Sequence, residues 1–176
     1  MNKYFAFIDE TQEGRYRLVV VAIPESEVAS AKSTLETLRL RGQKRIHMAK
    51  ESNRRRRHII NAVSGIPSWE AYVIESAPRR RITKETRQEL FLLAAQHPFW
   101  STLNLVIVED SNERERDKKV LAWLNRYGSH RFDYHFEKPS QDQGLWLPDI
   151  VGWAVAKGGG SWKTQLSDRL TILVAP

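Results

Sequence analysis

Two apolar segments of the sequence each end in a pair of acids. YFAFI is followed by Asp9 and Glu10, and LVIV is followed by Glu109 and Asp110. Segments this apolar are typical of strands in the middle of a sheet, where a charge is costly unless it is paired or binds a ligand. Ligands of α/β sheets usually lie at the carboxyl ends of the parallel strands, so we interpret both acid pairs as candidates for a ligand site. The alternative is that each strand reaches solvent there and turns.

A further acid lies within a strongly apolar segment near the end of the chain. In GLWLPDIVGWAVA, Asp149 is the only side chain that can ionise. On a helical wheel it falls between Leu145 and Trp153, within the surface that the helix should bury. A lone buried carboxylate is costly unless it is hydrogen-bonded, paired or bound to a metal. The alternative is that the helix begins just after Pro148 and that Asp149 only caps it.

Together these acids predict a metal site. If the two acid-ended strands are neighbours and the late helix packs over them, Asp9, Asp110 and Asp149 meet at one edge of the sheet. Carboxylates this close stay ionised only when a cation neutralises them. Oxygen ligands in a chain without cysteine favour a hard ion, Mg²⁺ or Mn²⁺. Two such ions about 3.5 to 4 Å apart, bridged by carboxylates, can hydrolyse phosphodiesters.

The positive charge of the chain is concentrated in one segment. The formal net charge is +7, and residues 39–58 hold nine Lys and Arg against the single acid Glu51, so the remainder is close to neutral. A local basic patch indicates a polyanion partner, most often nucleic acid, whereas the alternative is an ordinary solvated helix face. The residues that we expect to contact nucleic acid are Lys44, Arg45, Lys50, Arg54, Arg55, Arg56 and Arg57, with a second cluster at Arg79, Arg80 and Arg81.

Length and composition narrow the class of protein. The 176 residues suffice for one hydrophobic core, so we expect a single domain spanning 1–176. The absence of cysteine excludes disulfides, zinc ribbons and thiol catalysis. The sequence shows no leader peptide and no apolar stretch near the roughly 20 residues that span a bilayer. We therefore expect a cytoplasmic protein that makes no membrane contact.

The order of the expected elements predicts an α/β domain with a mixed sheet that opens with a β-hairpin and carries helices on both faces. The expected strands are 3–10, 16–23, 69–76, 103–110 and 132–138, and the expected helices are 25–40, 52–63, 83–96, 114–128 and 144–157. KRIHMAK fits either a short strand or an ordered loop. The closing LTILVAP, 170–176, is strand-like and either joins the sheet or docks on a partner, as in a homodimer or a larger complex.

Four short stretches, in order, resemble a known family. YFAFIDETQEG, RIHMAK, LVIVED and LWLPDIVGWAVAKGG are similar to segments of the prokaryotic DUF3800 family, which is assigned to the ribonuclease H-like fold. The chain departs from the family pattern at Thr11 and Gln12, which replace Ser and Gly, and at Trp146 and Pro148, which replace Gln and Ala. The resemblance implies a metal-dependent nuclease-like site whose catalytic residues are Asp9, Glu10, His47, Asp110 and Asp149.

The same resemblance implies a role for each acid. Asp9 would bridge two metal ions, and Asp110 and Asp149 would each hold one. Glu10 or Glu109 would add a further ligand. Glu75, at the end of AYVIE, is a weaker candidate ligand, and His47 would orient a water or the scissile phosphate unless it is a loop histidine without a role.

Two other readings of the sequence remain open. One is a nucleic-acid-binding or scaffold module on the same fold that performs no catalysis, in which the acids are structural and binding depends on salt but not on divalent ions. The other is a PIN-like nuclease, which also gathers acids at strand ends in an α/β sheet. The opening hairpin favours the ribonuclease H-like fold over the PIN-like one.

Overall fold

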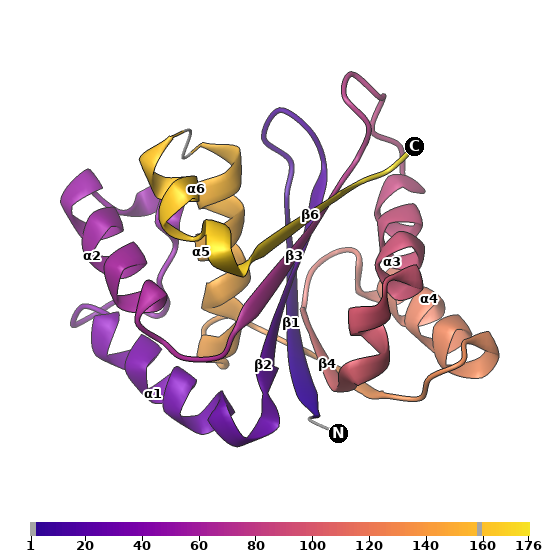
Figure 1. Cartoon of the computed structure of the whole chain (residues 1–176), viewed down its shortest axis with the longest axis horizontal. Coiled ribbons are helices and arrows are strands. Elements are labelled where there is room, and N and C mark those ends of the chain that lie inside the picture. Colours follow the sequence, from indigo (N-terminus) through magenta and orange to yellow (C-terminus); the bar gives the residue numbers. More distant parts are fainter. Residues whose placement is uncertain (1–2, 158–159) are drawn as a thin grey trace.

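The computed structural model describes residues 3–157 and 160–176, which form a six-stranded mixed sheet with helices on both faces (Figure 1). The strand order is β5-β4-β1-β2-β3-β6. Their bounds are β1 Tyr4–Thr11, β2 Arg17–Pro24, β3 Glu70–Glu75, β4 Leu103–Glu109, β5 Asp133–Glu137 and β6 Leu170–Val174. β2 runs antiparallel to β1 and β3, and the other neighbouring strands are parallel. The expected α/β class, mixed sheet and opening hairpin are confirmed.

The helices divide into two layers. Their bounds are α1 Val28–Leu38, α2 Asn53–Ser64, α3 Thr86–Gln96, α4 Arg114–Tyr127, α5 Trp146–Ala156 and α6 Ser161–Gln165. Figure 1 shows α1, α2, α5 and α6 on one side of the sheet and α3 and α4 on the other, and each side buries its own hydrophobic cluster. We call these sides the α5 face and the α3 face. KRIHMAK is an ordered loop with a short 3-10 turn at Met48–Lys50.

The closing segment of the chain joins the sheet. β6 pairs in parallel with β3, from Ala71 opposite Leu170 to Glu75 opposite Val174, and it lies at the edge beyond β3. Of the two possibilities that the sequence left open, this segment joins the sheet of its own chain. Within the ranges that the structure describes, no helix is both long and apolar enough to cross a membrane.

Side chains of β1 and β4 alternate between the two faces. Phe7 and Ile107 belong to the cluster on the α5 face, whereas Ile8 and Val108 belong to the cluster on the α3 face. Successive side chains of a strand point to opposite sides of the sheet. The first acid of each pair, Asp9 in β1 and Glu109 in β4, therefore points to the α5 face. The second acid of each pair, Glu10 or Asp110, points to the α3 face.

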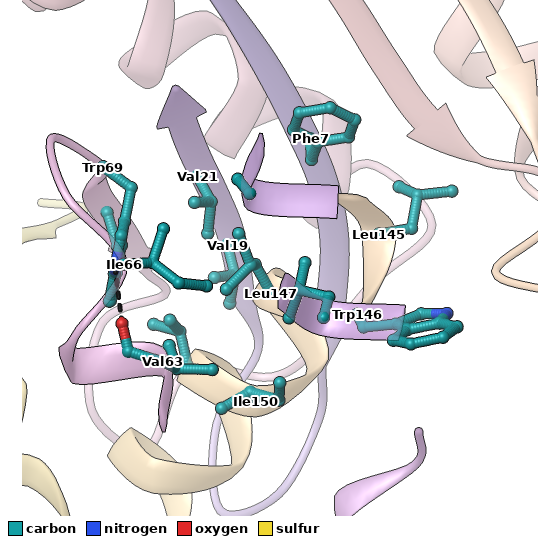
Figure 2. Close-up of a cluster of buried hydrophobic side chains, with 14 of the residues drawn as sticks. Phe7, Val19, Val21, Val63, Ile66, Trp69, Leu145, Trp146, Leu147 and Ile150 are labelled. Atoms are coloured by element: carbon teal, nitrogen blue, oxygen red, sulfur yellow. Dashed lines mark hydrogen bonds between the residues drawn. The ribbon is translucent and has the colours of Figure 1, made fainter. Parts of the chain in front are cut away.

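The approach of α5 to the sheet depends on a glycine. A Cβ at Gly144 would lie 2.1 Å from the ring of Phe7, so only glycine allows the chain to enter α5 this close to β1. Figure 2 shows Trp146, Leu147 and Ile150 packed with Phe7 and the valines of β2. The indole Nε1 of Trp146 donates to the Pro139 carbonyl at 2.7 Å, which satisfies its polar atom inside the core. This packing fixes where the first turn of α5 lies relative to the end of β1.

Candidate active site

Asp9 and Glu109 meet on the α5 face, at the carboxyl ends of β1 and β4. The two strands are parallel neighbours, with Ile8 opposite Val108, so the next residue of each strand brings the two carboxyl groups together. Asp9 is 8% exposed, and one of its oxygens accepts the backbone N–H of Glu10 at 2.7 Å. Burial raises the pKa of Asp9 well above its ordinary value, and the hydrogen bond and negative charge of Glu109 and the charge of Glu10 raise it further. Asp9 is therefore a buried acid that lies beside a second acid, Glu109, at the carboxyl ends of the central strands.

The raised pKa of Asp9 predicts how the metal-free protein responds to pH. The folded pKa lies above the unfolded value, so between the two values the folded state binds more protons. The stability that protonated Asp9 contributes is present below the ordinary carboxylate pKa and is lost as pH rises through the raised pKa. Thermal unfolding in chelator, from about pH 4 to pH 8, should show this fall, and Asp9→Asn should flatten it. An equal slope in the variant would assign the pH dependence to other groups.

Asp149 lies in the first turn of α5, where it does not cap its own helix but holds the loop that precedes α2. Its Oδ2 accepts the backbone N–H of Met48 at 2.8 Å, and its Oδ1 lies 3.1 Å from Nδ1 of His47. The side chain of Asp149 is 14% exposed and that of His47 is 39% exposed. Asp149 is therefore a partnered carboxylate, and it orients an imidazole that remains accessible.

Arg45 connects the two acidic groups. Its Nη1 lies 3.5 Å from Oε1 of Glu109, and its Nη2 lies 3.6 Å from Oδ1 of Asp149. Its Nε donates to the carbonyl of Ile46, which fixes the guanidinium against its own loop. We had expected Arg45 to contact nucleic acid, and the structure places it among the carboxylates.

A cavity of about 290 Å³ lies beside His47 and Asp149. Its lining includes His47, Asp149, Gln12, Trp153 and Lys157. A substrate group that entered this cavity would meet the imidazole, the Asp149 carboxylate and the indole of Trp153.

The second acid of each strand lies on the α3 face. Glu10 pairs with Arg87 of α3, and Asp110 lies 3.1 Å from the guanidinium of Arg114 in α4. We had expected both acids to hold metal beside Asp9, and the structure places them across the sheet from it. Glu109, which the sequence indicated as a possible further ligand, lies beside Asp9 in their place, as the strand alternation from Ile107 requires.

Arg87 is the centre of a buried ionic network on the α3 face. The residue is 3% exposed, and its Nε and Nη2 donate to the two oxygens of fully buried Asp117 at 2.7 and 2.9 Å. Its Nη1 donates to Glu10 and, at 3.1 Å, to the hydroxyl of Tyr16. Burial lowers the pKa of Arg87, but Asp117 and Glu10 more than offset this, so the guanidinium stays charged. Burial also raises the pKa of Tyr16 to about 12.

Glu75, at the carboxyl end of β3, is also committed to arginines. Its two oxygens each lie 2.8 Å from a guanidinium, one from Arg15 and the other from Arg17. These two ion pairs neutralise a carboxyl group that is 7% exposed. The structure gives Glu75 a role in closing the β1–β2 hairpin onto β3, away from Asp9.

The basic segment divides into structural and exposed residues. Arg55 bonds to Glu51 and to the Leu38 carbonyl, and Arg56 bonds to two carbonyls of the 48–50 turn while its guanidinium stacks 4.7 Å from the ring centre of Trp153. Of the residues in this segment that we expected to contact nucleic acid, Lys44, Lys50, Arg54 and Arg57 are exposed. Arg79, Arg80 and Arg81 are exposed in the loop that leads to α3, and Arg80 pairs with Glu89.

Only part of the ligand set that we expected for a hard divalent ion lies on the α5 face. Among residues 3–157 and 160–176, no group of three or more acidic or histidine side chains is close enough to hold a metal. The pair Asp9 and Glu109 nevertheless offers oxygen ligands of the kind that Mg²⁺ and Mn²⁺ prefer. Burial raises the pKa of Asp9, and the neighbouring carboxylates Glu109 and Glu10 raise it further, so a bound cation would be favourable there. This donor chemistry fits one ion at Asp9 and Glu109.

No protein-family model matches the chain, and no curated protein matches it. Solved structures do resemble it. The RNase HII of Archaeoglobus fulgidus, solved in a complex with PCNA, has a TM-score of 0.57 at 15% identity, covering 88% of this chain and 72% of that one. The ribonuclease H2 of Pyrococcus horikoshii has a TM-score of 0.57 at 12% identity with the same coverage of 88% and 72%. A point variant of Bst-RNase HIII has a TM-score of 0.55 at 11% identity, covering 95% of this chain and 55% of that one.

Identities this low establish the fold alone. The TM-scores of 0.55 to 0.57 extend over 88% to 95% of this chain, whose six-stranded mixed sheet carries helices on both faces, so the chain has a ribonuclease H-like fold. The fold expected from the resemblance in sequence is confirmed. What the site does has to be argued from its own residues.

Proposed function

We propose that this protein is a divalent-metal-dependent nuclease that hydrolyses phosphodiester bonds in DNA or RNA. The observation that carries the proposal is the contact between Asp9 and Glu109 at the ends of β1 and β4, on the same face as Asp149. β1 and β4 are neighbouring strands inside the sheet. Ligands of α/β sheets usually bind just outside the carboxyl ends of such strands. Membership of the DUF3800 family, which the sequence suggested, remains part of the proposal.

In this proposal Asp9 and Glu109 hold Mg²⁺ or Mn²⁺. The ion, when bound, would neutralise the two carboxylates and supply positive charge to a phosphate oxygen. Asp149 accepts a hydrogen bond from Nδ1 of His47 and so leaves Nε2 free for a water or a phosphate oxygen. His47 thus orients the reacting group, and Asp149 holds His47 in place.

Nucleic acid is the partner that the surrounding charge favours. Lys44, Lys50, Arg54 and Arg57 are exposed on the loop that carries His47 and on the first turns of α2. Exposed cations of this kind bind phosphates without reading sequence. Arg55 and Arg56 support them indirectly because both hold the loop in place.

The exposed arginines of α2 yield a test of this contact. We expect the double variant Arg54→Gln, Arg57→Gln to weaken nucleic-acid binding roughly tenfold at low salt, and to reduce the slope of log K against log salt by about 1.4 to 1.8. Binding measured by fluorescence anisotropy at several salt concentrations gives both quantities. The matched control is Lys118→Gln, Lys119→Gln, which removes two exposed charges from α4 on the α3 face. An equal loss in the control would indicate non-specific attraction.

The direct test of the activity is cleavage. The protein is incubated with single- and double-stranded DNA, with RNA and with an RNA–DNA hybrid, in Mg²⁺, in Mn²⁺ and in chelator. We expect at least one substrate to be cut with either ion, and none in chelator. Retained cleavage in chelator would contradict a metal-dependent site.

A non-catalytic nucleic-acid-binding module is the second candidate, and one observation favours it. Arg45 already lies between Glu109 and Asp149, and the described part of the chain brings no third acid to Asp9 and Glu109. Such a module would bind the same nucleic acids with a salt dependence but without a response to divalent ions. Binding without cleavage in every metal would support it.

A further inference from the structure

The three acids of the candidate site, Asp9, Glu109 and Asp149, differ in which groups already neutralise them. The Asp149 oxygens are occupied by the Met48 N–H, by His47 and by Arg45. Glu109 has Arg45 on one side and Asp9 on the other. Asp9 accepts only a backbone N–H beside its contact with Glu109, and no basic side chain pairs with it in the part of the chain that the structure describes. Positive charge is therefore present at Asp149 and missing at Asp9.

Arg45 is well suited to be a permanent part of this site. A guanidinium cannot lose its proton in a protein, so the charge between Glu109 and Asp149 is present at every working pH. The side chain is 25% exposed, and its Nε is tied to the Ile46 carbonyl. Its two terminal nitrogens are shared between two carboxylates at 3.5 and 3.6 Å, so it spans the space between β4 and α5.

We propose that Arg45 takes the place of a second metal ion, so that the site binds one divalent ion at Asp9 and Glu109 rather than two. The inference rests on the proposed function, because it assigns the cations of the same site. With Arg45 and one divalent ion, the three carboxylates are fully neutralised, whereas a second ion would leave an excess of positive charge. Arg45 also offers donors that can bind a phosphate oxygen, as arginine does in other phosphoryl-transfer sites.

The test is the number of Mn²⁺ ions that each chain binds. Wild type, Arg45→Gln, Arg45→Lys and Lys118→Gln are titrated with Mn²⁺ into the millimolar range, and free and bound ions are measured by electron paramagnetic resonance. We expect about one ion per chain for the wild type and for Arg45→Lys, which keeps the charge. We expect about two for Arg45→Gln, with the spectrum of a spin-coupled pair. Lys118→Gln removes an exposed cation of α4, on the α3 face, and should behave as the wild type.

The possible outcomes separate this inference from the proposed function. Two ions in the wild type would overturn the inference and leave a metal-dependent nuclease intact. One ion in both the wild type and Arg45→Gln would also overturn it, because Arg45 would then exclude nothing. Binding by none of the proteins, each shown by circular dichroism to be folded, would overturn the inference and the proposed function together.

Discussion

Replacing Arg87 with methionine is expected to destabilise the fold by about 3 to 5 kcal/mol, because it leaves the fully buried Asp117 carboxylate and the partly buried Glu10 carboxylate without their counter-charge. Asp117 is fully buried and receives two hydrogen bonds from Arg87. For a chain of this length the loss corresponds to a fall in Tm on the order of 10 °C. Chemical denaturation at pH 7 measures the free energy of unfolding directly.

Two further variants make this prediction specific. Arg80→Met removes an arginine whose pair with Glu89 is exposed, and it should cost less than about 1 kcal/mol. The double variant Arg87→Met, Asp117→Leu removes both buried charges and should recover a large part of the loss. If Arg87→Met is no more harmful than Arg80→Met, then the buried network does not stabilise the α3 face.

Replacing Asp9 with asparagine is expected to abolish metal binding and to lower the rate of cleavage by about 10³-fold or more, since a metal ion supplies several kcal/mol of charge stabilisation. The same change should stabilise the metal-free protein. Asp9 is a desolvated acid beside Glu109, and its pKa is raised because its charge is costly there. An amide removes that cost, so the Tm of the metal-free protein should rise. The amide oxygen can still accept the Glu10 N–H.

Opposite changes in stability and activity are the signature to measure. Differential scanning calorimetry in chelator gives Tm, and single-turnover cleavage in Mn²⁺ gives the rate. Asp133→Asn is the matched control, because Asp133 is an exposed acid at the start of β5. A lower Tm together with a lower rate would show that Asp9→Asn damages the fold, and it would remove the support that the variant lends to a metal site.

The fold was largely predictable because it follows from local patterns. Alternating apolar runs, turn residues and amphipathic helices are written in short stretches of sequence, and the hairpin-first order left few topologies. The neighbours of β6 were not predictable, since an edge strand carries no signal of its partner. Gly144 also gave no signal in the sequence, because its need for close contact with Phe7 arises only once α5 packs on β1.

The sequence predicted which strands and which helix contribute to the site, but it predicted only some of the residues that they bring there. Asp9 and Asp149 were picked from their apolar surroundings, and the structure does place both on the α5 face. The acid of β4 that lies there is Glu109 instead of Asp110, and the strand alternation from Ile107 would have revealed this. The partners of Glu10 and Asp149 lie 77 and 102 residues away along the chain, at Arg87 and His47, and no local pattern encodes such pairs.

The most direct test of the metal site compares Glu109→Gln with Asp110→Asn, two changes at adjacent residues of which one faces the α5 side and the other the α3 side. Each protein, and the wild type, is titrated with Mn²⁺ by isothermal calorimetry. We expect Glu109→Gln to lose binding and Asp110→Asn to bind as the wild type does, because only Glu109 lies beside Asp9. Loss of binding in Asp110→Asn with full binding in Glu109→Gln would contradict a metal site at Asp9 and Glu109.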